Sequence, residues 1–292
     1  MTPLPICAFC GTAAGLRFRR DPYAIHRCEG CDFEWVYPAP SAQILGELYG
    51  GNYFVGEGLG YTDYFSRESA SNKRKAEIRI ALLNRLVPAR GRLLDFGAAS
   101  GVFVERAQAH GWKAVGVEPA ESARAAAENT VQTSLFAELA PAAAHKPFDV
   151  ITAWDVLEHL ADAPRVLSTL AELMEAGGLV AVVVPVIENL NARMAPETWD
   201  QYKPPEHLTF FSRKSLKRAL EQTVGPVIHM EPAWERYNRY FCGTEHTSSS
   251  LTRALGRVEG SVAKALTRLH VAPQRWFEDS VLMIARKEHN LS

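Results

Sequence analysis

Residues 92–101 read RLLDFGAASG, an apolar run that ends in a turn of small residues, and a helical pattern follows. A strand, a glycine turn and a helix in this order form the first half of a βα unit. Gly97 and Gly101 let backbone N–H groups approach a ligand, and the following helix adds the positive end of its dipole. The stretch lacks the G-x-G-x-x-G pattern of dinucleotide-binding turns, which disfavours a nicotinamide-dependent oxidoreductase.

The same alternation of strand and helix continues on the C-terminal side of this turn. Alternating β and α segments with apolar strands predict a parallel sheet that is covered on both faces. We therefore predict an α/β fold with a Rossmann-like, mostly parallel, seven-stranded sheet over residues 91–292, and a helical insertion at about 233–276 that covers the active site. The expected strands are 92–96, 114–117, 150–154, 179–184, 227–230 and 280–286, and the expected helices are 102–110, 121–128, 162–175 and 212–222.

Four of the 5 cysteines lie near the N-terminus, as Cys7-x-x-Cys10 and Cys28-x-x-Cys31. Each pair can place two thiolates on one turn, and two such turns close a tetrahedral zinc site. A site filled by four thiolates has no open position for catalysis, so we predict a structural zinc ribbon over residues 1–40. We expect His26 to be a bystander.

Residues 41–90 are expected to be a linker and an N-terminal helical segment. The stretch 38–65 is rich in Gly, Pro and Tyr, which predicts an irregular connection. A charged helix is expected at about 66–86. It carries Lys73, Arg74 and Lys75, for which a solvated helix face is favoured over a phosphate clamp.

Composition excludes several classes of protein. The 292 residues carry 32 Lys and Arg against 33 Asp and Glu, so no overall positive field favours nucleic acid or an anionic membrane. The most apolar run, 177–187, is too short to span a bilayer. The N-terminus lacks a secretory pattern, and we expect a cytoplasmic protein. No pattern indicates an oligomeric state.

Two acidic residues complete the binding turn. Asp95 ends the first strand, where a carboxylate suits the positively charged methionine part of S-adenosylmethionine (SAM). Glu118 ends the next strand, within Gly-Val-Glu-Pro, where a carboxylate can accept both ribose hydroxyls of an adenosine. Together with the turn, these two residues favour SAM as the ligand.

The sequence resembles the class I SAM-dependent methyltransferases over residues 90–185. LLDFGAASGVF is similar to their first motif, GVEP to their acidic ribose-binding loop, and FDVITAWDVLEHL to their fourth-strand motif. Ala99 departs from the middle glycine of many members. The resemblance implies these cofactor-binding residues: Asp95, Gly97, Ala98, Gly101, Glu118, Pro119, Trp154 and Asp155.

A candidate catalytic set follows the fourth strand. Asp155, Glu158 and His159 lie just after residues 150–154, and His207 lies in PPEHLTFF. This pattern resembles the E-x-x-E-H…H set of small-RNA 2′-O-methyltransferases, with Asp155 at the first position, and a similar E-H segment occurs in ubiquinone-pathway O-methyltransferases. Three roles stay open: His159 or His207 as a general base without metal, a divalent metal site such as magnesium, or a structural role.

The sequence indicates the class of the substrate. The N-terminal four-cysteine module and the GNYF and PPEHLTFFS segments resemble a bacterial subgroup linked to sugars, polysaccharides and natural products. We predict O-methylation of a small-molecule or glycan hydroxyl. The alternatives are RNA 2′-O-methylation, which the missing basic surplus disfavours, and a non-catalytic SAM-binding scaffold. For the aromatic residues Tyr53, Tyr61, Tyr64, Trp199 and Tyr202, core packing is favoured over pocket lining.

Overall fold

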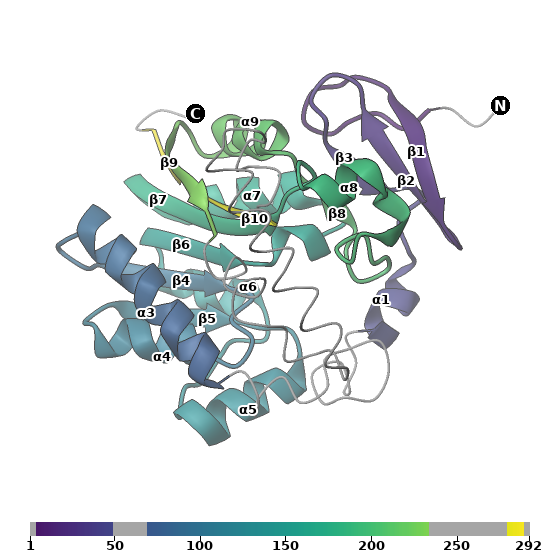
Figure 1. Ribbon diagram of the computed structural model, residues 1–292. Helices are drawn as coiled ribbons and strands as arrows, with labels where there is room; N and C mark the ends of the chain where they lie inside the picture. Colours follow the sequence, from purple (N-terminus) through teal and green to yellow (C-terminus); the bar gives the residue numbers. More distant parts are fainter. Residues whose placement is uncertain (1–3, 49–68, 234–278, 289–292) are drawn as a thin grey trace, which may run out of the picture.

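The computed structural model describes residues 4–48, 69–233 and 279–288 (Figure 1). Its larger part is a six-stranded mixed sheet. β4, β5, β6 and β7 are parallel to one another, and β10 runs antiparallel to both of its neighbours. The strands lie in the order β5 (Lys113–Val117), β4 (Arg92–Phe96), β6 (Phe148–Trp154), β7 (Met174–Pro185), β10 (Ser280–Arg286) and β9 (Val227–Pro232).

The predicted count of seven strands is not confirmed, because the described residues of this sheet form six strands and one isolated bridge. Phe136 pairs in parallel with Val117 on the outer side of β5. Its N–H donates to the Gly116 carbonyl at 2.9 Å, and its carbonyl accepts from the Glu118 N–H at 2.8 Å. Phe136 thus forms hydrogen bonds with backbone groups on the outer edge of β5, beside Glu118. The mostly parallel sheet has six strands and this bridge.

Helices cover both faces of the sheet, as predicted. Alternate residues of β4 point to opposite faces, so Leu93 packs in the cluster of α3 and α4 while Leu94 packs in the cluster of α7 and α9. In Figure 1, α3 and α4 lie together at the lower left of the sheet, and α9 lies at the top of the view, above β7. The helices are α1 (Ala42–Leu48), α3 (Ser69–Leu86), α4 (Val102–Ala109), α5 (Glu121–Val131), α6 (Leu139–Ala142), α7 (Ala163–Glu172), α8 (Leu190–Met194) and α9 (Arg213–Thr223).

The N-terminal segment forms a second sheet that includes a strand from the larger part. β1 (Ala14–Arg20), β2 (Tyr23–Cys28) and β3 (Glu34–Val36) form an antiparallel meander, and β3 pairs with β8 (Thr209–Phe210). Phe33 packs against Phe211 with the two rings tilted and their centroids 5.2 Å apart. The N-terminal segment, residues 4–36, which we call the ribbon, is therefore joined to the larger part by backbone pairing and by aromatic packing.

Three expectations need comment. The stretch 38–65 was expected to be irregular throughout, and this was wrong for Ala42–Leu48, which form α1 because the run AQILGEL contains good helix formers and no proline. The insertion at about 233–276 lies, apart from Ala233, outside the described residues, as do the tyrosines of residues 49–68. Among the described helices, none is long and apolar enough to cross a membrane.

Candidate functional site

The turn after β4 has the backbone conformation that its small residues predict. Gly97, Ala99 and Gly101 have φ angles of 79°, 45° and 70°. A Cβ at Gly97 would lie 2.5 Å from Cγ2 of Val156, so no larger residue fits there without movement. Gly101 is the N-cap residue of α4, and the turn brings the start of this helix to the carboxyl end of the sheet.

Asp95 lies buried beneath this turn, with 2% of its surface exposed. Its Oδ1 accepts a hydrogen bond of 2.6 Å from the Thr152 hydroxyl of the neighbouring strand β6. Burial raises the pKa of Asp95 to about 7, although the hydrogen bond from Thr152 and the charge of Arg79 act to lower it. A cation bound beside this carboxylate would favour its charged form.

Glu118 lies at the end of β5 and closes the turn from the other side. Its Oε2 accepts from the Ala99 N–H and its Oε1 from the Ala120 N–H, both at 2.9 Å. Burial raises the pKa of this carboxyl, while the two backbone hydrogen bonds act in the opposite direction. Glu118 is thus oriented by the backbone N–H groups of Ala99 in the turn and of Ala120, and each of its oxygens has further lone pairs for a ligand.

The end of β6 carries Trp154 and Asp155, and α3 adds an arginine that the sequence did not single out. The Arg79 guanidinium lies 4.4 Å from the centroid of the Trp154 ring. It also lies 3.9 Å from Oδ2 of Asp155, whose φ is 56°. Arg79 therefore holds the Trp154 ring and the Asp155 carboxylate next to the turn.

Three of the four predicted catalytic residues come together after β6. Ligand atoms of Glu158, His159 and His207 all lie within 4.8 Å of one another, and Asp155 is not part of this group. The two imidazole rings meet edge to face, with centroids 4.6 Å apart. Glu158 and His207 are each 2% exposed. We call these three residues the Glu-His-His group.

Backbone hydrogen bonds set the tautomers of both histidines. Nδ1 of His159 lies 2.9 Å from the Glu206 carbonyl oxygen, and Nδ1 of His207 lies 2.9 Å from the Gln201 carbonyl oxygen. A carbonyl only accepts, so Nδ1 carries the proton and the neutral ring has its lone pair on Nε2. Burial also lowers the pKa of His159 to about 4, which keeps this imidazole neutral near pH 7.

The segment that carries His207 is attached to the end of β6 on one side. The Leu208 N–H donates to the Glu158 carbonyl at 2.7 Å, and the Thr209 hydroxyl donates to the Leu157 carbonyl at 2.9 Å. These bonds bring two stretches that are far apart in the sequence into one site. His207 therefore reaches Glu158 and His159 only in the folded chain.

The ribbon holds the other side of this segment. The Tyr202 hydroxyl donates to Oε2 of Glu34 on β3 at 2.5 Å, and both residues are fully buried. Arg17 and Arg27 also donate to Glu34, through its Oε1. Since Tyr202 follows Gln201, whose carbonyl orients His207, the ribbon supports the geometry of the Glu-His-His group. Trp199 and Tyr202 are both buried, which agrees with the packing role that the sequence favoured.

The four cysteines of the ribbon form a compact cluster. Cys7, Cys10, Cys28 and Cys31 place their sulfur atoms within 4.8 Å of one another, and the four thiols are not joined in disulfides. The Cys7–Cys31 and Cys10–Cys28 sulfur distances are 3.6 and 3.2 Å. Four thiolates at the usual Zn–S distance of about 2.3 Å have edges of about 3.8 Å, so the donor set fits a tetrahedral metal ion.

The sequence singled out the turn, the Glu-His-His residues and the cysteine cluster, but not the contacts of the residues that support them. Arg79, Thr152, Glu34 and Tyr202 each act through a partner that is distant in the sequence. A periodic pattern signals a face of a helix or a strand, and carries no information about a single pairing across the fold. Buried charged and hydroxyl residues at strand positions, such as Glu34 and Thr152, were the available signal.

Several known proteins are similar to this chain in sequence. The family model described as "Methyltransferase domain" matches residues 70–223, which is more than half of the chain. The ubiquinone biosynthesis O-methyltransferase of Caulobacter sp. (strain K31) is 30% identical, over 41% of this chain and 56% of that protein. The chain thus spans only about half the length of this relative.

Two solved structures share the fold. Magnesium protoporphyrin IX methyltransferase from Synechocystis PCC 6803, with bound SAH, has a TM-score of 0.53 and 13% identity, over 85% of this chain and 100% of that chain. Phosphoethanolamine N-methyltransferase 2 of Haemonchus contortus, in complex with SAM, has a TM-score of 0.50 and 16% identity, over 78% of this chain and 58% of that chain. At these identities the likeness establishes the arrangement of the chain.

Proposed function

We propose that this chain, which belongs to the methyltransferase-domain family, transfers the methyl group of SAM to a hydroxyl of a small-molecule or glycan acceptor. The observation that carries the proposal is the position of the Glu-His-His group. It follows directly after β6, the strand whose Thr152 holds Asp95 of the binding turn. The residues suited to a donor and those suited to proton transfer therefore lie along the carboxyl edge of the same parallel strands, where ligands bind in such sheets.

The donor would be held by residues from three strands. Asp95 offers a buried carboxylate to the cationic methionine part, and Glu118 offers oriented oxygens to the ribose hydroxyls. Gly97, Ala98, Gly101 and Pro119 shape the loops between them, while Trp154 and Asp155 form the wall at the end of β6. SAM supplies a methyl group on a sulfonium sulfur, which leaves with the C–S electron pair as the neutral thioether SAH.

The acceptor hydroxyl must lose its proton as its oxygen attacks that methyl carbon. Nε2 of His207 or of His159 carries the lone pair in the neutral ring and can take the proton, while Nδ1 stays bonded to a backbone carbonyl. The new bond is O–CH3 and the broken bonds are O–H and S–CH3. Glu158, within reach of both rings, would stabilise the imidazolium that forms.

The same group also fits a divalent metal ion, which is the second candidate for acceptor activation. Two imidazole nitrogens and one carboxylate oxygen within 4.8 Å form a set of protein ligands, with both histidine tautomers already presenting Nε2. Bound there, a metal would lower the pKa of an acceptor hydroxyl. Imidazole donors suit zinc, iron or manganese better than magnesium, so the donor set favours these ions over the magnesium that the sequence suggested.

We infer that zinc in the cysteine cluster has a structural role. Four cysteines fill a tetrahedral ion and leave no position for substrate. The cluster lies in the same hydrophobic core as Phe33 and β7, so the metal would brace the ribbon against the sheet and thereby the segment that carries His207.

A variant of His207 tests the proposal. The purified protein is given SAM with an isotopically labelled methyl group and a panel of phenolic, catechol and glycoside acceptors, and the release of SAH is measured. His207→Ala should abolish turnover of any acceptor that the wild type methylates, while SAM affinity by calorimetry stays nearly intact. His110 is an exposed histidine that directly follows α4 and pairs with Glu77, so His110→Ala is the matched control and should keep full activity.

Several results would contradict the assignment. Persistent methylation by His207→Ala would remove the Glu-His-His group from the mechanism. A chelator is added under conditions in which the cysteine cluster keeps its zinc. If activity is lost and manganese then restores it, the metal mechanism would be selected over the metal-free base. SAM binding without SAH release on any acceptor would favour the non-catalytic scaffold.

A further inference from the structure

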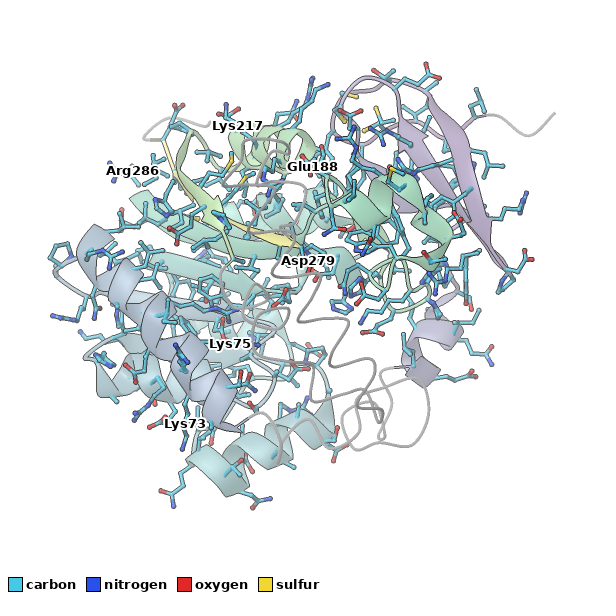
Figure 2. All side chains as sticks on the ribbon, in the orientation of Figure 1. Lys73, Lys75, Glu188, Lys217, Asp279 and Arg286 are labelled. Atoms are coloured by element: carbon cyan, nitrogen blue, oxygen red, sulfur yellow. The ribbon has the colours of Figure 1, made fainter. Side chains whose placement is uncertain are left out.

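A cavity of about 440 Å³ lies where the ribbon meets the larger part of the molecule. Its walls come from three regions: the ribbon, the segment that follows β7, and the start of α9. Figure 2 shows Glu188 between α9 and the ribbon, which marks this junction. The charged side chains that line it are Arg17, Arg27, Asp32, Glu188, Arg193 and Lys214.

The cavity concentrates positive charge in a chain with a formal net charge of −1. Four cationic side chains line it against two carboxylates. Asp32 is held by Arg27 at 2.8 Å and lies 3.6 Å from Lys214. Arg17 and Arg27 share the buried carboxylate of Glu34, which fixes the positions of both guanidinium groups. The arginines are thus set in place by the fold before any ligand arrives.

A carboxylate of the chain itself already lies at the edge of this cavity. The Arg213 N–H, in the first turn of α9, donates to Oε1 of Glu188 at 2.7 Å. Ser212 caps the same helix through its hydrogen bond from the Ser215 N–H. The start of α9 is therefore satisfied internally, and a ligand in the cavity would be bound mainly by side chains of Arg17, Arg27 and Lys214.

We propose that this cavity binds the phosphoryl group of a phosphorylated small molecule. An arginine side chain has five N–H donors in a planar fork that matches phosphate oxygens, and Arg17 and Arg27 use only part of theirs on Glu34, Asp32 and the Ala192 carbonyl. The volume lies within the range of about 300–1,000 Å³ that small-molecule sites occupy. It exceeds that of a phosphate ion and leaves room for the organic part of the ligand.

The residues of this site are separate from the turn after β4 and from the Glu-His-His group. Binding of a phosphate ester needs no methyl transfer, so the proposal stands or falls independently of the proposed function. It also assigns the ribbon a second role, because two of its arginines would contact the ligand.

The test uses the full-length, zinc-loaded protein and calorimetry with pyrophosphate, with succinate as a dicarboxylate probe. The wild type should bind pyrophosphate more tightly than succinate, with an affinity that falls as NaCl is added. Lys214→Ala should weaken pyrophosphate binding by at least about tenfold, since loss of one charged hydrogen bond costs about that factor. Lys214 is exposed, so the variant should fold.

Lys217→Ala is the matched control. It removes one positive charge from the exposed side of the same helix, where Lys217 pairs with Glu221 outside the cavity, and it should leave pyrophosphate affinity within about twofold. An equal loss in Lys217→Ala and in Lys214→Ala would show a general charge effect and overturn the site. No binding of pyrophosphate to the wild type, or tighter binding of succinate, would overturn the phosphoryl assignment. SAM affinity, measured on the same samples, should not change.

Discussion

The hydrogen bond between Tyr202 and Glu34 gives the most direct test of how the ribbon is coupled to the rest of the molecule. Tyr202→Phe removes one hydroxyl from a fully buried position and leaves the ring, which packs against Phe18, Trp199 and Phe210. Burial raises the pKa of Tyr202, so the hydroxyl stays protonated and donates at any ordinary pH. The substitution therefore isolates a single buried hydrogen bond to a carboxyl.

The expected loss can be worked from this contact. A hydrogen bond to a charged group contributes about 1.5–3 kcal/mol, and Oε2 of Glu34 would lose this donor in a site that is fully buried. For a protein of this size, about 1 kcal/mol corresponds to about 2–4 °C in the unfolding temperature. Tyr202→Phe should therefore lower the unfolding temperature by roughly 3–12 °C in differential scanning calorimetry at pH 7.5.

Tyr37→Phe is the control for the loss of a hydroxyl, since Tyr37 directly follows β3 and is 36% exposed. It should change the unfolding temperature by less than about 1 °C. The reasoning would be refuted if the two variants gave the same small shift. A double-mutant cycle with Glu34→Gln adds a check, because the two losses should fall short of additivity if the contact couples them.

Three further predictions concern the binding turn and the cysteine cluster. Gly97→Ala should reduce SAM affinity by at least about tenfold in calorimetry, since the added Cβ would lie 2.5 Å from Val156. Gly177→Ala, at the same φ of 79° but with no atom within 4 Å of the added Cβ, is the control, and equal affinities would contradict the geometry. Asp95→Asn should stabilise the SAM-free protein increasingly as pH rises from 5 to 8. The pKa of Asp95 is raised to about 7, so its contribution to stability is present at low pH and is lost as pH rises through that value; a pH-independent difference between thermal unfolding curves would refute this. Cys28→Ser should lower zinc content and the unfolding temperature, whereas zinc retained in full by mass spectrometry would remove Cys28 from the cluster.

The fold was largely predictable because its signals are local. Strands such as 92–96 and 280–286 were placed with the bounds that the structure has, since an apolar run between turn residues needs no distant partner to be recognised. The seventh strand was not, because Phe136 forms a bridge through contacts with Gly116 and Glu118 and has no strand pattern of its own.

The site divides in the same way. The carboxylates of Asp95 and Glu118 and the small residues of the turn were found from their order along the chain, because strand ends in a parallel sheet face one edge. Arg79 was missed, since a charged residue on a helix is usually solvated and only the packing of α3 brings it over Trp154.

The residue order by itself determined the α/β class, the turn at 97–101 and the two cysteine pairs, because each depends on spacings of a few residues that set backbone conformation locally. Only the tertiary structure decided that His207 joins Glu158 and His159, that β3 pairs with β8, and that the ribbon contributes Arg17 and Arg27 to a cavity beside α9. These pairings form between segments separated by many residues. They exist because burial of the sheet and hydrogen bonds across the fold select one arrangement of the whole chain.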